Sequence, residues 1–257
     1  MRTNCIYSFV QKQTTYSITR TLSDPRFKTY IQAAGGSEKQ ALLLYLWNIE
    51  MAGAVAATTG MVEVQLRNSI NSRLQTWNAS QPVNDPNRSC AYTRNWLKDP
   101  APRLRQIISP PRKRPLWQKA EPALRDEFGN CAKPNPSHDD LVAALPFGSW
   151  LFILPQPQVS SPQNPRMRIW DETLKHAFTA RNASEFQSAN PAVIYQWANA
   201  VRHARNRASH LEPLLDSGQL IRVHRISARL MHSMNPAAAS WLAGQQYIHS
   251  VLKRKPV

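Results

Sequence analysis

The chain has 257 residues, of which 42% are hydrophobic and eight are tryptophans, so it can bury a sizeable core and is not a disordered protein. Lysine and arginine number 32 against 16 aspartates and glutamates, which gives a net charge of +16. A charge this basic favours a polyanionic partner, nucleic acid before a membrane surface, and does not distinguish RNA from DNA.

The cysteines and the apolar runs bear on redox state, metals and location. Cys5, Cys90 and Cys131 are widely spaced and form no CxxC pair and no zinc-type cluster with histidine, so we expect no metal and no cofactor. The N-terminal MRTNCIYSFVQKQTTYS lacks the apolar run of a signal peptide. The longest apolar run, residues 141–155, is shorter than the roughly 20 residues that cross a bilayer. We therefore expect a reduced, cytoplasmic protein without a membrane partner.

Helical signals recur along the chain and strand signals are scarce, so we predict an all-α fold. Ser37 is a candidate N-cap for a helix that begins at Glu38 and carries SEKQALLLYLWNIEMAGAVAA. Gly60 either breaks this helix or merely weakens it. The next segment, residues 61–77, carries one buried stripe of apolar side chains three or four residues apart: Val62, Leu66, Ile70, Leu74 and Trp77.

The amino-acid composition changes in residues 82–136, which contain ten of the twenty prolines. Such a density forbids long helices, and we expect an extended, partly mobile insertion within a single domain of residues 1–257. Two interpretations remain open. The insertion is a plain linker, or it is an arm that grips nucleic acid, in which Arg112, Lys113 and Arg114 bind phosphates and Trp96 or Trp117 stacks on bases.

Regular structure is expected again from Ser137. The string SHDD resembles a capping box formed by Ser137 and Asp140, and the apolar run over 141–154 is a predicted core segment. Pro191 is well placed at the first position of a long helix that ends at about Leu211. One or two further helices are expected between Leu220 and Leu252.

The long helix has an apolar face and a polar face. The predicted core side contains Ile194, Trp197, Val201, Ala204, Ala208 and Leu211, and the other side Asn199, Arg202, His203, Asn206 and His210. Arg205 lies at the edge of the apolar stripe, about 140° around an ideal helix from His210. The polar side is either an ordinary solvated face or a metal-free site for phosphodiester cleavage. In such a site a histidine moves protons and an arginine stabilises charge on the phosphate.

The string ARNRASHLEPLL resembles the signature of the Abi-like (abortive infection) proteins, a bacterial family of the HEPN superfamily. The motif joins an arginine and a polar residue to a histidine after a short spacer, here Arg205, Asn206 and His210, and Glu212 follows as in the family's His-x-Glu-Pro. Two earlier segments are similar to the family's other blocks. One contains Glu63, Arg67 and Asn68, and the other contains Phe147, Gly148 and Trp150. The segments follow the family's order over about residues 45–215, and the proline-rich stretch is not covered.

This resemblance implies an all-helical HEPN-type bundle with metal-independent endoribonuclease activity, completed by a homodimer. It also implies a role in phage defence or as a toxin, sometimes with an antitoxin or a small non-coding RNA. Arg205, Asn206 and His210 are then the expected catalytic residues. We expect a supporting shell of Glu63, Arg67, Asn68, Arg202 and Glu212, RNA contacts from Arg112, Lys113, Arg114 and Arg207, and packing roles for Phe147, Gly148 and Trp150.

Other interpretations stay open at this point. Glu63 and Arg67 are four residues apart and form an ordinary surface pair on any helix. The chain is alternatively a non-catalytic, HEPN-like RNA-binding module of a phage-defence ribonucleoprotein. A sequence-specific DNA repressor is a weaker alternative, because no convincing helix-turn-helix is present.

Overall fold

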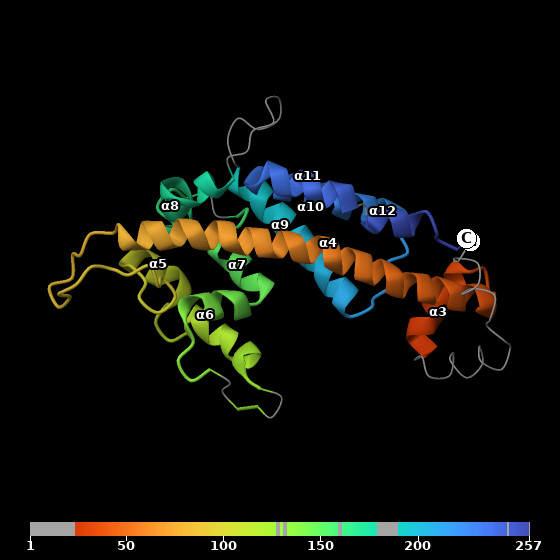
Figure 1. Cartoon of the computed structure of the whole chain (residues 1–257), viewed down its shortest axis with the longest axis horizontal. Helices are drawn as coiled ribbons and strands as arrows, with labels where there is room; N and C mark the ends of the chain where they lie inside the picture. Colours follow the sequence, from red (N-terminus) through yellow and green to blue (C-terminus); the bar gives the residue numbers. More distant parts are fainter. Residues whose placement is uncertain are drawn as a thin grey trace.

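The computed structural model describes residues 24–126, 129–130, 133–158, 161–178, 190–245 and 247–256. These residues form helices and connecting loops without a β-strand, so the predicted all-α fold is confirmed. One long helix, α4 (Glu38–Ala79), runs along nearly the whole long axis of the molecule (Figure 1). Helices α3 (Asp24–Ala33), α9 (Pro191–Ser209), α10 (Ser217–Met234) and α12 (Tyr247–Leu252) all pack directly against it.

The length of α4 follows from its cap and its packing. Ser37 is the N-cap, and its side chain accepts a hydrogen bond from the Gln40 amide, as predicted. Gly60 does not break the helix, which continues for 42 residues. The predicted stripe is confirmed, since Val62, Leu66, Ile70, Leu74 and Trp77 are all buried. By length and composition alone, α4 could also cross a membrane. This is weak evidence for a membrane span, because 56% of the most apolar window of α4 is buried inside the protein.

The proline-rich segment is folded, and the expectation of an extended insertion is wrong. It contains α5 (Pro102–Ile108) and the 3-10 helix η1 (Leu116–Leu124), both short, as the proline density requires. Its buried side chains join the same core cluster as the second half of α4: Trp96, Leu97, Leu104, Ile107, Ile108, Leu116 and Ala120. Trp96 is completely buried, with its indole N–H donating to the Asn71 side-chain oxygen at 2.8 Å, so it does not stack on bases. Trp117 is half-buried against this cluster.

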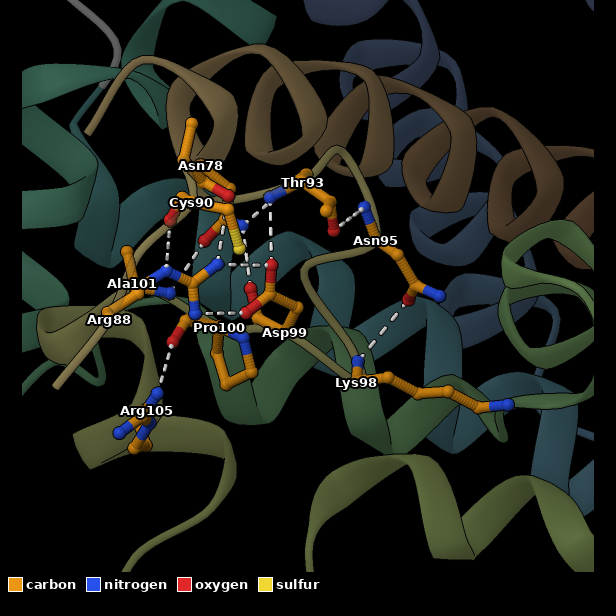
Figure 2. A network of polar contacts seen from close by, with 11 residues as sticks. Asn78, Arg88, Cys90, Thr93, Asn95, Lys98, Asp99, Pro100, Ala101 and Arg105 are labelled. Atoms are coloured by element: carbon orange, nitrogen blue, oxygen red, sulfur yellow. Dashed lines mark hydrogen bonds and ion pairs between the residues drawn. The ribbon is translucent and has the colours of Figure 1, made fainter. Parts of the chain in front are cut away.

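A polar network at the end of α4 anchors the start of this segment (Figure 2). The buried Asn78 amide donates to the carbonyls of Thr93 and Asp99 at 2.7 and 2.9 Å, and its oxygen accepts from the Ala101 amide at 2.8 Å. Arg88 makes two 2.8 Å hydrogen bonds to the Asp99 carboxylate. Burial raises the pKa of Asp99, but the hydrogen bonds from Arg88 and Thr93 outweigh it and hold that pKa below its ordinary value. These side chains satisfy backbone groups in a segment that has little regular structure.

The following apolar run forms two short helices. The capping box of Ser137 and Asp140 begins α6 (His138–Ala144), as predicted. Pro146 separates α6 from α7 (Phe147–Ile153), because a proline is disfavoured inside a helix and accepted at its start. The packing roles of Phe147 and Trp150 are confirmed by their burial. Gly148 is exposed, and a Cβ placed there meets no atom within 4 Å, so its expected packing role is wrong.

The C-terminal helices agree with most of the predicted helix positions and buried residues. Pro191 begins α9, with Asn190 as its N-cap, and His210 is the C-cap. On the predicted core side Ile194, Val201, Ala204 and Ala208 are buried, while Trp197 and Leu211 are half-buried. The expectation of one or two later helices is wrong, since α10, α11 (Pro236–Gln245) and α12 follow. Helix α8 (Pro165–Glu172) and the 3-10 helix η2 (Leu174–Ala177) precede α9.

The burial of the proline-rich segment predicts a clear difference between two variants. Trp96→Ala should lower the free energy of unfolding by about 3–5 kcal/mol, because it leaves a large cavity in the core. Replacing the exposed Arg112, Lys113 and Arg114 together by alanine should change it by less than about 1 kcal/mol. Urea denaturation followed by circular dichroism measures both. Equal stability of the Trp96 variant and the wild type would contradict the buried position.

Candidate functional site

The motif histidine lies in a turn that closes α9. The Leu211 amide donates to the Ala208 carbonyl at 3.0 Å and the Glu212 amide to the Arg207 carbonyl at 2.9 Å, which is the Schellman pattern of helix termination. The pattern requires a left-handed residue, and Leu211 takes this role with φ 49°. A residue with a side chain is disfavoured there by about 1–2 kcal/mol, so the turn depends on support from other elements.

A buried amide on α4 gives that support. The Asn48 side chain is fully buried; it donates to the Glu212 carbonyl at 3.2 Å and accepts from the Leu214 amide at 2.7 Å. Sequence reasoning missed Asn48, and the available signal was one amide inside the apolar string LLLYLWNIEM. Buried polar groups are normally hydrogen-bonded, so this amide had to meet a partner elsewhere in the chain.

Arg207 and Glu212, predicted as RNA-binding and supporting residues, also stabilise this turn. The Arg207 guanidinium donates to the Pro213 carbonyl at 2.6 Å, to the Glu212 carboxylate at 3.2 Å and to the Gln219 side chain at 3.2 Å. Its donors are thus directed at groups of the protein. Arg26 of α3 adds one more hydrogen bond, from its guanidinium to the His210 carbonyl at 3.1 Å.

Two predicted catalytic side chains at the C-terminal end of α9 are accessible. His210 is exposed and Asn206 is half-buried. The His210 amide donates to the Asn206 carbonyl at 3.1 Å, as expected for neighbours four residues apart. Within the described residues, neither the imidazole of His210 nor the amide group of Asn206 hydrogen-bonds another side chain or the backbone. Both groups are therefore available to a ligand.

The third predicted catalytic residue, Arg205, faces α4. Its Nε lies 3.7 Å from the Glu63 carboxylate, and the Glu63 side chain is only 17% exposed. Burial raises the pKa of Glu63 above its ordinary value, although the guanidinium groups of Arg205 and Arg67 act to lower it. Arg67 also donates to the Ala143 carbonyl of α6 at 3.3 Å. The structure thus brings Glu63, Arg67 and Arg205 together from helices distant in sequence.

The remaining predicted site residues do not join the group of Glu63, Arg67 and Arg205. Arg205 and His210 are separated by about 7.5 Å along the helix axis and about 140° around it, and no hydrogen bond joins them in the described part of the chain. Arg202 contacts Asn199 and His203 on its own helix. Asn68 lines a separate polar pocket of about 440 Å³ with Ser72, Arg73 and His176. The expected single shell is therefore divided among several places.

The expected RNA contacts of the proline-rich segment are exposed. Arg112, Lys113 and Arg114 lie on the loop between α5 and η1, where Arg112 adopts φ 64°.

Of the cysteines, Cys90 is exposed, while Cys5 and Cys131 lie outside the described residues. Across the described ranges, no group of three His, Cys, Asp or Glu side chains is placed to hold a metal ion.

The part of the chain around His210 is poor in acids. Residues 191–257 contain nine lysines and arginines against two acids, and the sequences of α9 and α10 contain no acid at all. Both acids have local roles, since Glu212 pairs with Arg207 and Asp216 caps α10 by accepting from the Gln219 amide. Arg205 and Arg207 are paired with acids, whereas Arg202 of α9 and the arginines of α10 form no ion pair within the described residues, which favours an anionic ligand.

Comparisons of the chain with family models, with curated proteins and with solved structures find no match.

The Asn48 contacts predict an effect specific to that amide. Asn48→Ala should lower the free energy of unfolding by about 2–4 kcal/mol, because it leaves the buried Leu214 amide and the partly buried Glu212 carbonyl without their partner. Asn68→Ala, an exposed asparagine on the same helix, is the matched control and should cost less than about 0.5 kcal/mol. Urea denaturation measures both, and similar losses for the two variants would contradict the role of Asn48.

The raised pKa of Glu63 predicts a pH dependence of stability. A carboxyl whose folded pKa is raised contributes stability that is present below its unfolded value and is lost as the pH rises through the folded value. The unfolded value is about 4.5, so the free energy of unfolding of Glu63→Gln minus that of the wild type should increase between pH 4 and pH 7. A constant or decreasing difference, measured by denaturation at several pH values, would contradict the dominance of burial over the two arginines.

Proposed function

We propose that this protein binds RNA on the α9–α10 surface and cleaves it as a metal-independent endoribonuclease of the HEPN type. The observation that carries the proposal is the accessible His210 imidazole, which lies at the end of an acid-free helix in a turn braced by Asn48 and Arg207. An acid–base group whose backbone is fixed and whose ring makes no hydrogen bond within the described residues, on a surface poor in acids, suits reactions at a phosphodiester.

The proposed chemistry uses the 2′-hydroxyl next to the scissile phosphate. The 2′-hydroxyl loses its proton as its oxygen bonds to phosphorus, and the 5′-oxygen gains a proton as its bond to phosphorus breaks. His210 takes the first proton or gives the second, and water carries out the other transfer. The products are a 2′,3′-cyclic phosphate and a 5′-hydroxyl. Arg205 stabilises the charge on the phosphate oxygens, and Asn206 orients the imidazole or the phosphate.

A second copy of the chain is part of the proposal. Arg205 and His210 lie about 140° apart around α9. Arg205 faces Glu63 of α4, whereas the His210 imidazole makes no hydrogen bond within the described residues, so one copy does not direct both at the same phosphate. Two copies with their α9 helices facing each other would supply Arg205 from one and His210 from the other. The same resemblance suggests a cytoplasmic role in phage defence or as a toxin, with an antitoxin or a small RNA as a further partner.

One observation favours a second candidate function, an RNA-binding module that does not cleave. Arg205 already pairs with Glu63, which leaves it less available to a phosphate. The exposed Arg112, Lys113 and Arg114 would then contribute to affinity more than His210 does. Cleavage and binding assays separate the two candidates.

The nuclease proposal predicts a loss of cleavage in His210→Ala of about 10²- to 10⁴-fold, because one acid–base group is removed. The measurement uses end-labelled RNA in EDTA, with analysis of the product ends for cyclic phosphate. His176→Ala is the control, since His176 is exposed and lines the separate pocket on α4, and this variant should cleave like the wild type. Equal cleavage by the wild type and His210→Ala would contradict the proposal, and RNA binding without cleavage by either would support the binding module.

A further inference from the structure

A groove of about 520 Å³ lies between α9 and α10, next to the turn that carries His210. Much of its lining is apolar and comes from α4, from both helices and from the segment after the turn: Val55, Ala200, Ala204, Leu214, Val223 and Ile226. The volume is within the range of pockets that enclose small molecules, about 300–1,000 Å³. An apolar lining of this size accepts a planar, weakly polar group.

Two of the three charged side chains that line the groove, apart from histidine, are arginines. Arg222 lines it, is exposed, and makes no hydrogen bond or ion pair with any other residue that the structure describes. His203 and Arg207 line it as well, although Arg207 is bonded to the turn and His203 contacts Arg202. The lining acid, Asp216, accepts a hydrogen bond from the Gln219 amide as the N-cap of α10. Among the described residues that line the groove, Arg222 is thus the charged side chain without a bonding partner, and its complement is an anion.

The groove and His210 share their walls. Arg207, Pro213 and Leu214 flank His210 in the turn and also line the groove. Helix α3 contacts both places, because Arg26 bonds the His210 carbonyl and Thr29, three residues later on the same face, lines the groove. A ligand in the groove is therefore adjacent to the turn that presents the imidazole.

We infer that this groove is a subsite for one unpaired nucleotide of the bound RNA, with its base against the apolar lining and its phosphate against Arg222. An apolar base face combined with an anionic phosphate matches the two halves of the groove. A base inside a duplex is stacked and offers only its edges, so the subsite selects unpaired RNA. The inference rests on the proposed function for the identity of the partner as RNA, and not on cleavage.

The test measures binding of fluorescein-labelled 2′-O-methyl RNA, which lacks the attacking hydroxyl and stays intact with the full-length protein. One probe is a 12-nucleotide strand without self-pairing, and the other is the same strand annealed to its complement. Ala200→Phe fills the groove, and Arg222→Gln removes its free charge. The matched controls are Ala237→Phe, at an exposed position of α11, and Arg225→Gln, an exposed arginine of α10 that does not line the groove.

Ala200→Phe should weaken binding of the unpaired strand about tenfold, without changing its salt dependence and without affecting the duplex. Arg222→Gln should weaken binding and reduce the slope of log affinity against log salt by about 0.7, as for one phosphate contact on a single strand. Ala237→Phe should match the wild type, and Arg225→Gln should weaken both probes alike. Wild-type affinity in Ala200→Phe, or an equal loss for both probes, would overturn the subsite.

The same measurement separates this inference from the proposed function. If His210→Ala abolishes cleavage while Ala200→Phe and Arg222→Gln bind normally, the nuclease stands and the subsite is wrong. If no variant alters cleavage but the groove variants lose the unpaired strand selectively, the subsite stands in a binding module. Absence of wild-type binding to either probe would overturn both the subsite and RNA as the partner.

Discussion

The buried amide of Asn48 is the interaction on which the candidate site depends. The turn after α9 places Leu211 in a left-handed conformation that this residue type disfavours. Such a turn persists only where its surroundings determine it, and the two hydrogen bonds from Asn48 join it to a helix 164 residues earlier in the chain. Arg207 and Arg26 add bonds from two other directions. The position of the His210 backbone is thus set by three helices, while its imidazole remains accessible.

Helix α4 connects the separate parts of the molecule through polar side chains at different points along its length. Asn78 and Asn71 hold the proline-rich segment, Glu63 faces Arg205, and Asn48 holds the turn of His210. Glu63 of α4 thus faces Arg205, while Asn48 of the same helix holds the turn five residues further along the chain. The pairing of Arg205 with Glu63, on a different side of α9 from His210, is the reason that the nuclease proposal needs a second copy and that a binding module is the second candidate.

The sequence predicted the local features well, because caps and apolar periodicity depend on neighbouring residues. Long-range features were missed for physical reasons. A lone glycine costs a helix only about 1 kcal/mol, which packing along α4 offsets, so Gly60 was ambiguous. Proline density excludes long helices but not burial, so the sequence left open that Trp96 stacks on bases, whereas it is completely buried. The role of Asn48 follows only from contacts between distant parts of the chain. The angle between Arg205 and His210 around the helix could be predicted from the sequence. The pairing of Arg205 with Glu63 could not, because it joins two helices that are far apart in the chain.

The central claim is that RNA meets the protein on the α9–α10 surface beside His210. The most direct measurement is ultraviolet cross-linking of the full-length protein to unpaired RNA in EDTA, followed by mass-spectrometric mapping of the cross-linked peptides. Our account predicts cross-links concentrated between His203 and Arg222, on both sides of the His210 turn. Cross-links confined to the loop of Arg112, Lys113 and Arg114, or spread evenly over the chain, would contradict it.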